Sequence, residues 1–254
     1  MSLVAPSELE PELEALLSRW VPDMSSRWQS ASEEDIAAIE AIAGGELPRC
    51  YRWLLHRLGH GFDEICFGSL DFSARCIVEG YARGLFPHHE GMMCIANDTA
   101  EDQPQLRYYD LAHPVRDDAP VFMTEPEGED LMPHYETLRE LIASATFRNY
   151  RLRPMPFRVE GIIGAESGGN VLDALLPLFD ELGFRAPVPC GPLCLLYDDG
   201  ALAFASYQSP AWATPDGLSF NLGGPSEGEL RKLLGIVSTS TRLEVRRLTW
   251  QPSI

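Results

Sequence analysis

The chain has 254 residues, of which 20 are Lys or Arg and 38 are Asp or Glu, so its formal net charge at pH 7 is −18. With 45% hydrophobic residues the chain can build a packed core, which excludes an intrinsically disordered protein. The negative charge excludes DNA, RNA and anionic lipid as direct ligands, because their phosphates would repel the protein. The chain has no run of about 18 apolar residues, so no membrane span is predicted.

The first part of the chain predicts three helices. The first covers residues 8–20. The second begins after Ser32, which can cap it with Asp35 as its reciprocal partner, and ends at the glycines 44–45. The third follows Pro48. Its apolar face is formed by Tyr51, Leu54, Leu55 and Leu58, spaced three and four residues apart.

After this helical region the apolar pattern becomes that of short strands. Turn-rich acidic segments separate them, which is typical of an antiparallel sheet. The predicted strands are residues 65–67, 92–96, 106–109 and 120–123. A helix over residues 73–84 is expected between the first two strands, and a closing helix over residues 133–145.

These segments resemble a known family. Residues 30–59, SASEEDIAAIEAIAGGELPRCYRWLLHRLG, are similar to the opening helix pair of the SUKH superfamily, which reads Ser-Glu-Glu-x-Ile, a Gly turn, and then Leu-Pro-x-x-Tyr. Later segments are similar to its strands and last helix in the same order: 85–96, 106–111, 119–121 and 135–142. The chain departs from the family at residues 59–61, which read Gly-His-Gly where members often have Asn-Gly-Gly.

The resemblance covers about residues 28–146 and implies an α+β fold, with an antiparallel sheet flanked by helices. Members are mostly not enzymes. Many are immunity proteins that bind and neutralise toxins deployed between bacteria, and others regulate cell-wall synthesis in fungi through protein contacts. What the resemblance implies for this chain is a protein-binding scaffold.

Charge and proline divide the chain near residue 153. Residues 1–153 hold 27 acidic and 13 basic residues, a net charge of −14, whereas residues 154–254 hold 11 and 7, a net charge of −4. Pro154 and Pro156 disfavour a helix at the same place. We therefore predict two domains, 1–153 and 154–254.

The second domain is predicted to be a smaller α+β module. Its strands cover residues 157–163, 193–197, 201–207 and 243–250, and its helices cover residues 170–182 and 226–234. Residues 218–221 either extend a strand or form another. Asp199 and Gly200 suit a hairpin turn between the second and third strands. The order βαββαβ is that of a ferredoxin-like fold, which by itself implies no function.

A metal-dependent hydrolase is the alternative that the histidines suggest. Its ligands would be His56, His60, His88, His89 and Glu90. His56 and His60 are four residues apart on a predicted helix, but Arg57, Leu58 and Gly59 lie between them, so the His-Glu-x-x-His motif is missing. Cys190 and Cys194 lack the second pair that a zinc site needs. We therefore expect no metal, no cofactor and no catalytic residue.

Acidic segments supply the candidate binding residues. They are Asp98, Glu101, Asp102, Asp117, Asp118, Glu125, Glu127, Glu129 and Asp130. If the loops that carry them meet at one end of the sheet, they form an acidic rim that attracts a basic partner. Acidic loops also keep proteins soluble, so their presence alone does not decide between these roles.

These observations predict a non-catalytic immunity protein, which binds a basic bacterial toxin domain and occludes its active site. A regulatory scaffold without a toxin partner is the other non-enzymatic possibility. Acids precede the first apolar run, where a secretion signal carries basic residues, so we expect the protein in the cytoplasm, with its cysteines reduced. The sequence predicts no oligomeric state.

Overall fold

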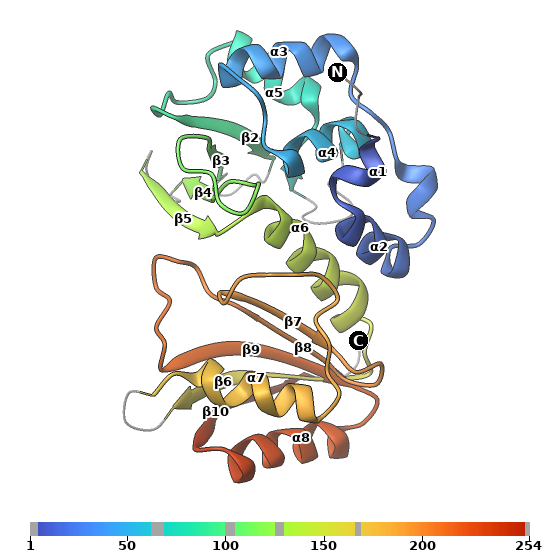
Figure 1. The fold of residues 1–254 in the computed structure, drawn as a ribbon, viewed down its shortest axis with the longest axis vertical. Helices are drawn as coiled ribbons and strands as arrows, with labels where there is room; N and C mark the ends of the chain where they lie inside the picture. The colour runs from blue at the N-terminus through green and yellow to red at the C-terminus, as the bar shows by residue number, and fades with distance from the viewer. Residues whose placement is uncertain (1–4, 62–68, 100–104, 125–129, 166–168, 252–254) are drawn as a thin grey trace. The chain divides into compact units, whose positions relative to one another are not determined.

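The computed structural model describes residues 5–61, 69–99, 105–124, 130–165 and 169–251. The chain divides into two compact units, the N-terminal unit of residues 1–145 and the C-terminal unit of residues 146–254. Each contains a five-stranded antiparallel sheet with helices, so the predicted α+β class is confirmed (Figure 1). The predicted junction at residue 153 lies just after this division, at the end of the π-helical turn η2 (Phe147–Leu152).

The N-terminal unit begins with helices, and one short strand, a helix, four consecutive strands and a closing helix follow. Its helical elements are α1 (Pro6–Leu9), α2 (Pro11–Trp20), η1 (Met24–Arg27), α3 (Glu33–Ala43), α4 (Arg49–Leu58), α5 (Ala74–Ala82) and α6 (Leu138–Thr146). Its strands are β1 (Leu70–Asp71), β2 (Met92–Asp98), β3 (Arg107–Asp110), β4 (Val121–Thr124) and β5 (Leu131–Tyr135). The predicted strand at residues 65–67 lies outside the described residues.

Local chemistry explains the boundaries of α3. The hydroxyl of Ser32 accepts a hydrogen bond from the backbone N–H of Asp35 at 3.0 Å and donates one to its carboxylate at 2.7 Å, so the predicted cap is confirmed. Gly44 then ends the helix in a left-handed conformation, with φ at +72°. A residue without a Cβ adopts this conformation at little cost.

The start of the closing helix was predicted wrongly. Residues 133–135 belong to β5, and Tyr135 pairs with Val121 of β4. The helix α6 begins at Leu138, after Thr137, whose hydroxyl accepts a hydrogen bond from the backbone N–H of Glu140 at 3.2 Å. Tyr135 lies three residues before Leu138, so its spacing fits the helical pattern, but strand pairing decides its conformation.

The N-terminal core forms where α4 meets the sheet. All four residues of its predicted apolar face are buried. The Tyr51 ring of α4 packs against Tyr109 of β3, with 5.7 Å between ring centroids. Tyr108, the next residue of β3, contacts His89 instead, with 4.8 Å between centroids. Because neighbouring residues point to opposite faces, β3 is covered on both sides.

The C-terminal unit has one strand more than predicted. Its elements after η2 are β6 (Phe157–Ala165), α7 (Val171–Glu181), β7 (Cys194–Asp198), β8 (Ala203–Tyr207), β9 (Gly217–Gly224), α8 (Glu227–Ser240) and β10 (Leu243–Gln251). The sheet order is β10-β6-β9-β8-β7, all antiparallel. Residues 218–221 lie in β9, a separate strand that pairs with both β6 and β8. The predicted βαββαβ order is therefore βαβββαβ.

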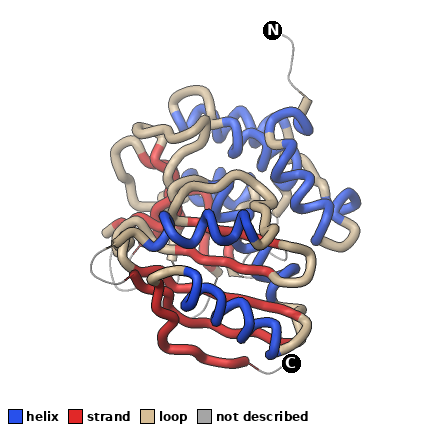
Figure 2. Tube along the Cα trace, turned by 60° about the horizontal axis from the view of Figure 1, so that its bottom comes forward, coloured by secondary structure: helices blue, strands red, loops and turns tan. Residues whose placement is uncertain are grey.

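Two consecutive glycines show how the C-terminal sheet is covered. A Cβ on Gly224 would meet Leu230 of α8 at 2.8 Å, whereas a Cβ on Gly223 would meet Met155, just after η2, at 2.5 Å. Neighbouring strand residues face opposite sides of a sheet, so α8 and the 147–155 segment lie on different faces. The helix α7 lies beside α8, and the apolar core fills the space between both helices and the sheet (Figure 2).

Candidate functional site

The order of strands in the N-terminal sheet decides which acidic segments meet. The four strands β2, β3, β4 and β5 form a meander in which each strand pairs with the next. Ala96 pairs with Arg107, and Thr124 with Leu131, at one end of the sheet. The connections over residues 99–106 and 125–130 therefore leave and re-enter the sheet at that end, and residues 111–120 connect β3 to β4 at the opposite end.

Hydrogen bonds join the bases of the two connections that share an end. The side-chain amide of Gln105 donates to the backbone carbonyl of Thr124 at 3.2 Å, and the Thr124 hydroxyl accepts from the backbone N–H of Leu106 at 3.1 Å. The carboxylate of Asp98 accepts from the backbone N–H of Gln105 at 3.3 Å. The ends of both connections are thereby held beside each other.

Together these connections contain acids and no basic residue. Residues 97–105 contain three acids and residues 124–130 contain four, with no Lys, Arg or His in either. We call these two segments the acidic end of the sheet. Asp98 is half-buried and Asp130 is exposed. Five predicted binding residues of these segments lie outside the described residues: Glu101, Asp102, Glu125, Glu127 and Glu129.

The nearest basic residue along the chain lies beneath the acidic end. Arg107 is 8% exposed, and its Nη1 donates to the backbone carbonyls of Gln105 and Leu106 at 3.0 and 3.4 Å. This guanidinium thus binds the backbone at the base of the 99–106 connection. The positive charge of Arg107 is therefore largely shielded from an approaching partner.

Asp117 and Asp118, two of the candidate binding residues, do not lie at the acidic end, so the acidic loops do not all meet at one end of the sheet. Both lie on the β3–β4 connection, at the opposite end of the sheet. Asp117 is exposed and lines a groove of about 450 Å³ that it shares with Arg49 and Arg52. Its surroundings are therefore of mixed charge.

Asp118 is fully buried and has a structural role. Its carboxylate accepts hydrogen bonds from the backbone N–H of Ala119 at 2.8 Å, from the backbone N–H of Arg139 at 2.9 Å, and from the Tyr109 hydroxyl. Burial raises the pKa of Asp118, and these hydrogen bonds oppose the rise. The contact with Arg139 satisfies a donor near the start of α6, which is the role of a helix cap.

The turn that delivers Asp118 to the core uses an unusual backbone conformation. Arg116 and Asp117 have positive φ values of 51° and 61°, and the backbone groups of Val115 and Asp118 bond to each other at 2.8 and 2.9 Å. This is the geometry of a two-residue hairpin turn. Arg116 is held by Glu140 of α6 at 2.8 Å. The sequence predicted a turn-rich acidic segment between these two strands, and the structure places the turn at Arg116 and Asp117.

A buried ion pair also escaped prediction from sequence. Glu10 is 3% exposed, and its carboxylate accepts from Nε and Nη2 of Arg139 at 2.6 and 2.7 Å. This bidentate pair connects the N-terminal helices to α6 across 129 residues of sequence. Because the partners are so far apart in the chain, no local spacing pattern reveals them.

The candidate ligands of the hydrolase alternative do not come together as a metal site. In the described part of the chain, no group of three or more His, Cys, Asp or Glu residues is placed to hold a metal ion. His56 belongs to α4, His60 follows that helix, and the ring of His89 packs edge-on against Tyr108. The hydrolase alternative therefore lacks the cluster of five ligands on which it depended.

The three cysteines that the structure describes in the N-terminal unit are not activated nucleophiles. Cys50, Cys76, Cys94, Cys190 and Cys194 are free thiols. Burial raises the pKa of Cys76 to about 11, and it also raises the pKa values of Cys50 and Cys94. Thiols with raised pKa values stay protonated at neutral pH and react slowly.

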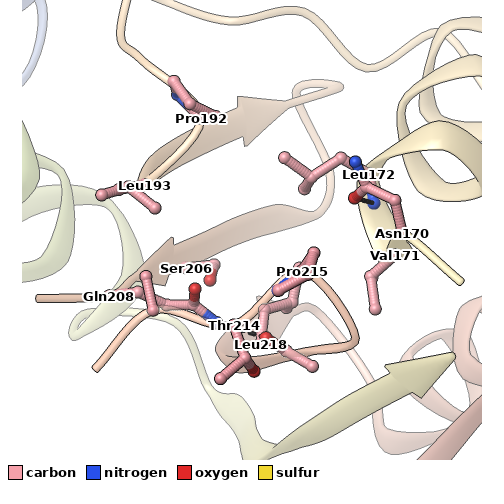
Figure 3. Close-up of a pocket in the computed structure, with 12 residues that line it drawn as sticks. Asn170, Val171, Leu172, Pro192, Leu193, Ser206, Gln208, Thr214, Pro215 and Leu218 are labelled. Carbon is pink, nitrogen blue, oxygen red and sulfur yellow. Dashed lines mark hydrogen bonds between the residues drawn. The ribbon is translucent and has the colours of Figure 1, made fainter. Parts of the chain in front are cut away.

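The C-terminal unit contains an open pocket of about 260 Å³ at the start of α7 (Figure 3). Its lining has no side chain that titrates near neutral pH; it is Asn170, Val171, Leu172, Pro192, Leu193, Ser206, Gln208, Ala213, Thr214, Pro215, Gly217 and Leu218. The Gln208 amide donates to the backbone carbonyl of Gly217, and Asn170 caps α7. This lining supplies shape and hydrogen bonds but no general acid or base.

No protein-family model, curated protein or solved structure matches this chain. The similarity to the SUKH superfamily therefore stays a prediction from the motifs in residues 28–146. Among the helices that the structure describes, none is both long enough and apolar enough to cross a membrane.

Proposed function

We propose that this protein is a non-catalytic, cytoplasmic immunity protein that binds a basic bacterial toxin domain and occludes its active site. The observation that carries the proposal is the acidic end of the N-terminal sheet. There two segments hold seven acids and no basic residue. Gln105 and Leu106 join their bases through hydrogen bonds to Thr124, and Asp98 closes the base of the first segment by accepting from the backbone N–H of Gln105. The similarity of residues 28–146 to SUKH immunity proteins supports the same role.

The physical argument concerns association with an oppositely charged partner. Clustered charges of one sign steer a partner of the opposite sign and raise its association rate by roughly 10 to 10³-fold. Nuclease toxins are often basic because they bind phosphates, so an acidic surface complements the face that carries their active site. A protein that covers this face blocks the substrate without any chemistry of its own.

The experiment measures binding to the toxin domain encoded beside this gene. Four neutralising substitutions are made at the acidic end: Glu125→Gln, Glu127→Gln, Glu129→Gln and Asp130→Asn. The control removes four exposed acids from α2 and α3 of the same unit: Glu12→Gln, Glu33→Gln, Glu34→Gln and Glu40→Gln. Both variants lose the same charge, so only the position of that charge differs.

We expect the loop variant to bind at least 10-fold more weakly by calorimetry and to lose protection of toxin-expressing cells. The control should bind like the natural protein, and the natural affinity should fall as salt rises from 50 to 300 mM. Equal protection by both variants would remove the role of the acidic end. Failure of the natural chain to bind or neutralise the toxin would reject the immunity function altogether.

A further inference from the structure

A second polar cavity in the C-terminal unit has the opposite charge to the acidic end. Its volume is about 260 Å³, and it lies where η2 and the residues after it meet the sheet. Its charged and amide side chains include Arg148, Arg153, Arg158, Glu160, Asn221 and Gln251. Three arginines and one acid give the cavity lining a formal charge of +2, whereas the rest of the C-terminal unit has more acidic than basic residues.

The π-helical turn places two of the arginines together. The backbone N–H of Arg153 donates to the carbonyl of Arg148 at 2.8 Å, which is an i to i+5 hydrogen bond. This wide turn brings residues five apart in sequence onto the same side of the helix. Such π-helical segments are rare and are frequently found at functional sites.

The third arginine comes from the strand beneath this turn. Val159 of β6 points into the core under α7 and α8, so its neighbour Arg158 points to the opposite face. That is the face on which the 147–155 segment lies, because Gly223 leaves room there for Leu152 and Met155. Sheet and π-turn thus direct arginines toward one cavity from two sides.

These arginines lack the carboxylate partners that their neighbours have. Arg151 of the same turn binds Asp198 at 2.8 Å, and Arg185, Arg231 and Arg246 also pair with acids. Within the described residues, no carboxylate lies within ion-pair distance of Arg148, Arg153 or Arg158. The Nε of Arg158 is shielded from solvent and has no hydrogen-bond acceptor there. A buried donor without an acceptor is unfavourable, so a bound acceptor would stabilise this arrangement.

We propose that this cavity binds the phosphoryl group of a small phosphorylated molecule. A phosphate monoester carries about −1.5 to −2 charges at pH 7, which matches the +2 of the cavity. The planar guanidinium donates two parallel hydrogen bonds to phosphate oxygens, and arginine is the side chain best suited to this contact. Asn221 and Gln251 add amide donors. The volume of about 260 Å³ has room for a phosphoryl group with a small substituent.

The first experiment titrates the full chain with inorganic phosphate at constant ionic strength. Binding is followed by calorimetry and by the thermal unfolding midpoint, with chloride and succinate as comparison anions. We expect saturable binding of phosphate, a higher midpoint, and at least 10-fold weaker binding of succinate. Phosphate that stabilises no more than chloride, or succinate that binds as tightly, overturns the proposal.

Three substitutions locate the site. Arg153 is exposed, so Arg153→Gln should fold normally and weaken phosphate binding at least 10-fold. Glu160→Gln removes the one acid of the lining and should tighten binding several-fold, an effect that a purely structural role would not produce. Arg185→Gln is the control, because it removes an exposed arginine that pairs with Asp180 outside the cavity. Unchanged affinity in the Arg153 and Glu160 variants overturns the assignment to this cavity.

Discussion

Two aspartates of this protein have different roles because one is exposed and the other is buried. Asp117 and Asp118 are adjacent in sequence, yet one faces solvent and the other accepts three hydrogen bonds in the core. The positive φ values of Arg116 and Asp117 reverse the chain direction, so the side chain of Asp118 points into the core. An acid-rich segment therefore cannot be assigned to a surface until the turn that contains it is known.

The Asp118→Asn and Asp117→Asn variants test this distinction, since each replaces one carboxylate by an amide. We expect Asp118→Asn to lower the free energy of unfolding by about 1–3 kcal/mol. Both carboxylate oxygens of Asp118 accept from a backbone N–H, and the amide NH₂ of Asn cannot accept, so one of these N–H groups would lose its acceptor. Asn tolerates the left-handed conformation of residue 117, so Asp117→Asn should change the free energy of unfolding by less than about 0.5 kcal/mol. Urea denaturation measures both, and equal losses would contradict the assigned roles.

His134 gives the protein a predicted sensitivity to acid. Burial, with a contribution from Arg107, lowers the pKa of His134 to about 3. The unfolded chain takes up this proton near pH 6.5 and the folded chain does not, so the folded state loses stability as pH falls through this range. Between pH 7 and 5.5 this loss is about 1 kcal/mol.

His134→Gln removes this dependence, so the natural protein should lose about 1 kcal/mol more than the variant between pH 7 and 5.5. Urea denaturation at several pH values above the sequence pI of 4.6 provides the measurement. His60→Gln, at an exposed position, is the control and should retain the natural pH profile. A natural slope in the His134 variant would assign the acid sensitivity to other groups.

Elements were predicted well where the deciding contacts are local. The cap at Ser32 and the apolar face of α4 depend on residues within a few positions, and both are confirmed. Elements decided by distant partners were predicted poorly. Residues 133–135 form a strand because they pair with β4. The acidic segments are separated because a meander places successive connections at opposite ends of the sheet.

Packing at the end of α4 requires a glycine at position 59. The chain at Ala31 runs so close to Gly59 that a Cβ there would lie 2.5 Å from the Ala31 backbone nitrogen and 2.4 Å from the Leu55 carbonyl oxygen. The same stretch is held by a hydrogen bond from Ala31 N–H to Leu55 at 2.8 Å. Glycine is therefore required by close packing of backbone on backbone.

We expect Gly59→Ala to destabilise the N-terminal unit by about 2–4 kcal/mol, because backbone atoms must move to admit the methyl group. Gly45→Ala is the matched control, since no atom lies within 4 Å of its Cβ position. That variant should change stability by less than about 0.5 kcal/mol. Denaturant unfolding compares the two, and similar values for both would show that the contact at Ala31 relaxes without cost.

At the scale of the whole molecule, charge and packing follow the same division. Residues 1–145 hold 27 acidic and 10 basic residues, which is −17 of the net charge of −18. The C-terminal unit combines a nearly balanced charge with an arginine-lined cavity. Each unit also has its own sheet and its own buried residues. Separate cores of this kind are what allows two parts of one chain to bind different partners.

Separate cores also predict that damage to one unit stays within it. Gly224→Ala would place a methyl group 2.5 Å from Leu202 and 2.8 Å from Leu230, both in the C-terminal unit. In hydrogen exchange measured by mass spectrometry, this variant should lose protection in β6 to β10 and retain it in β2 to β5. Gly59→Ala should give the reverse pattern. Loss of protection across both sheets in either variant would show that the chain unfolds as one cooperative body, because local damage would then lower the stability of every strand equally.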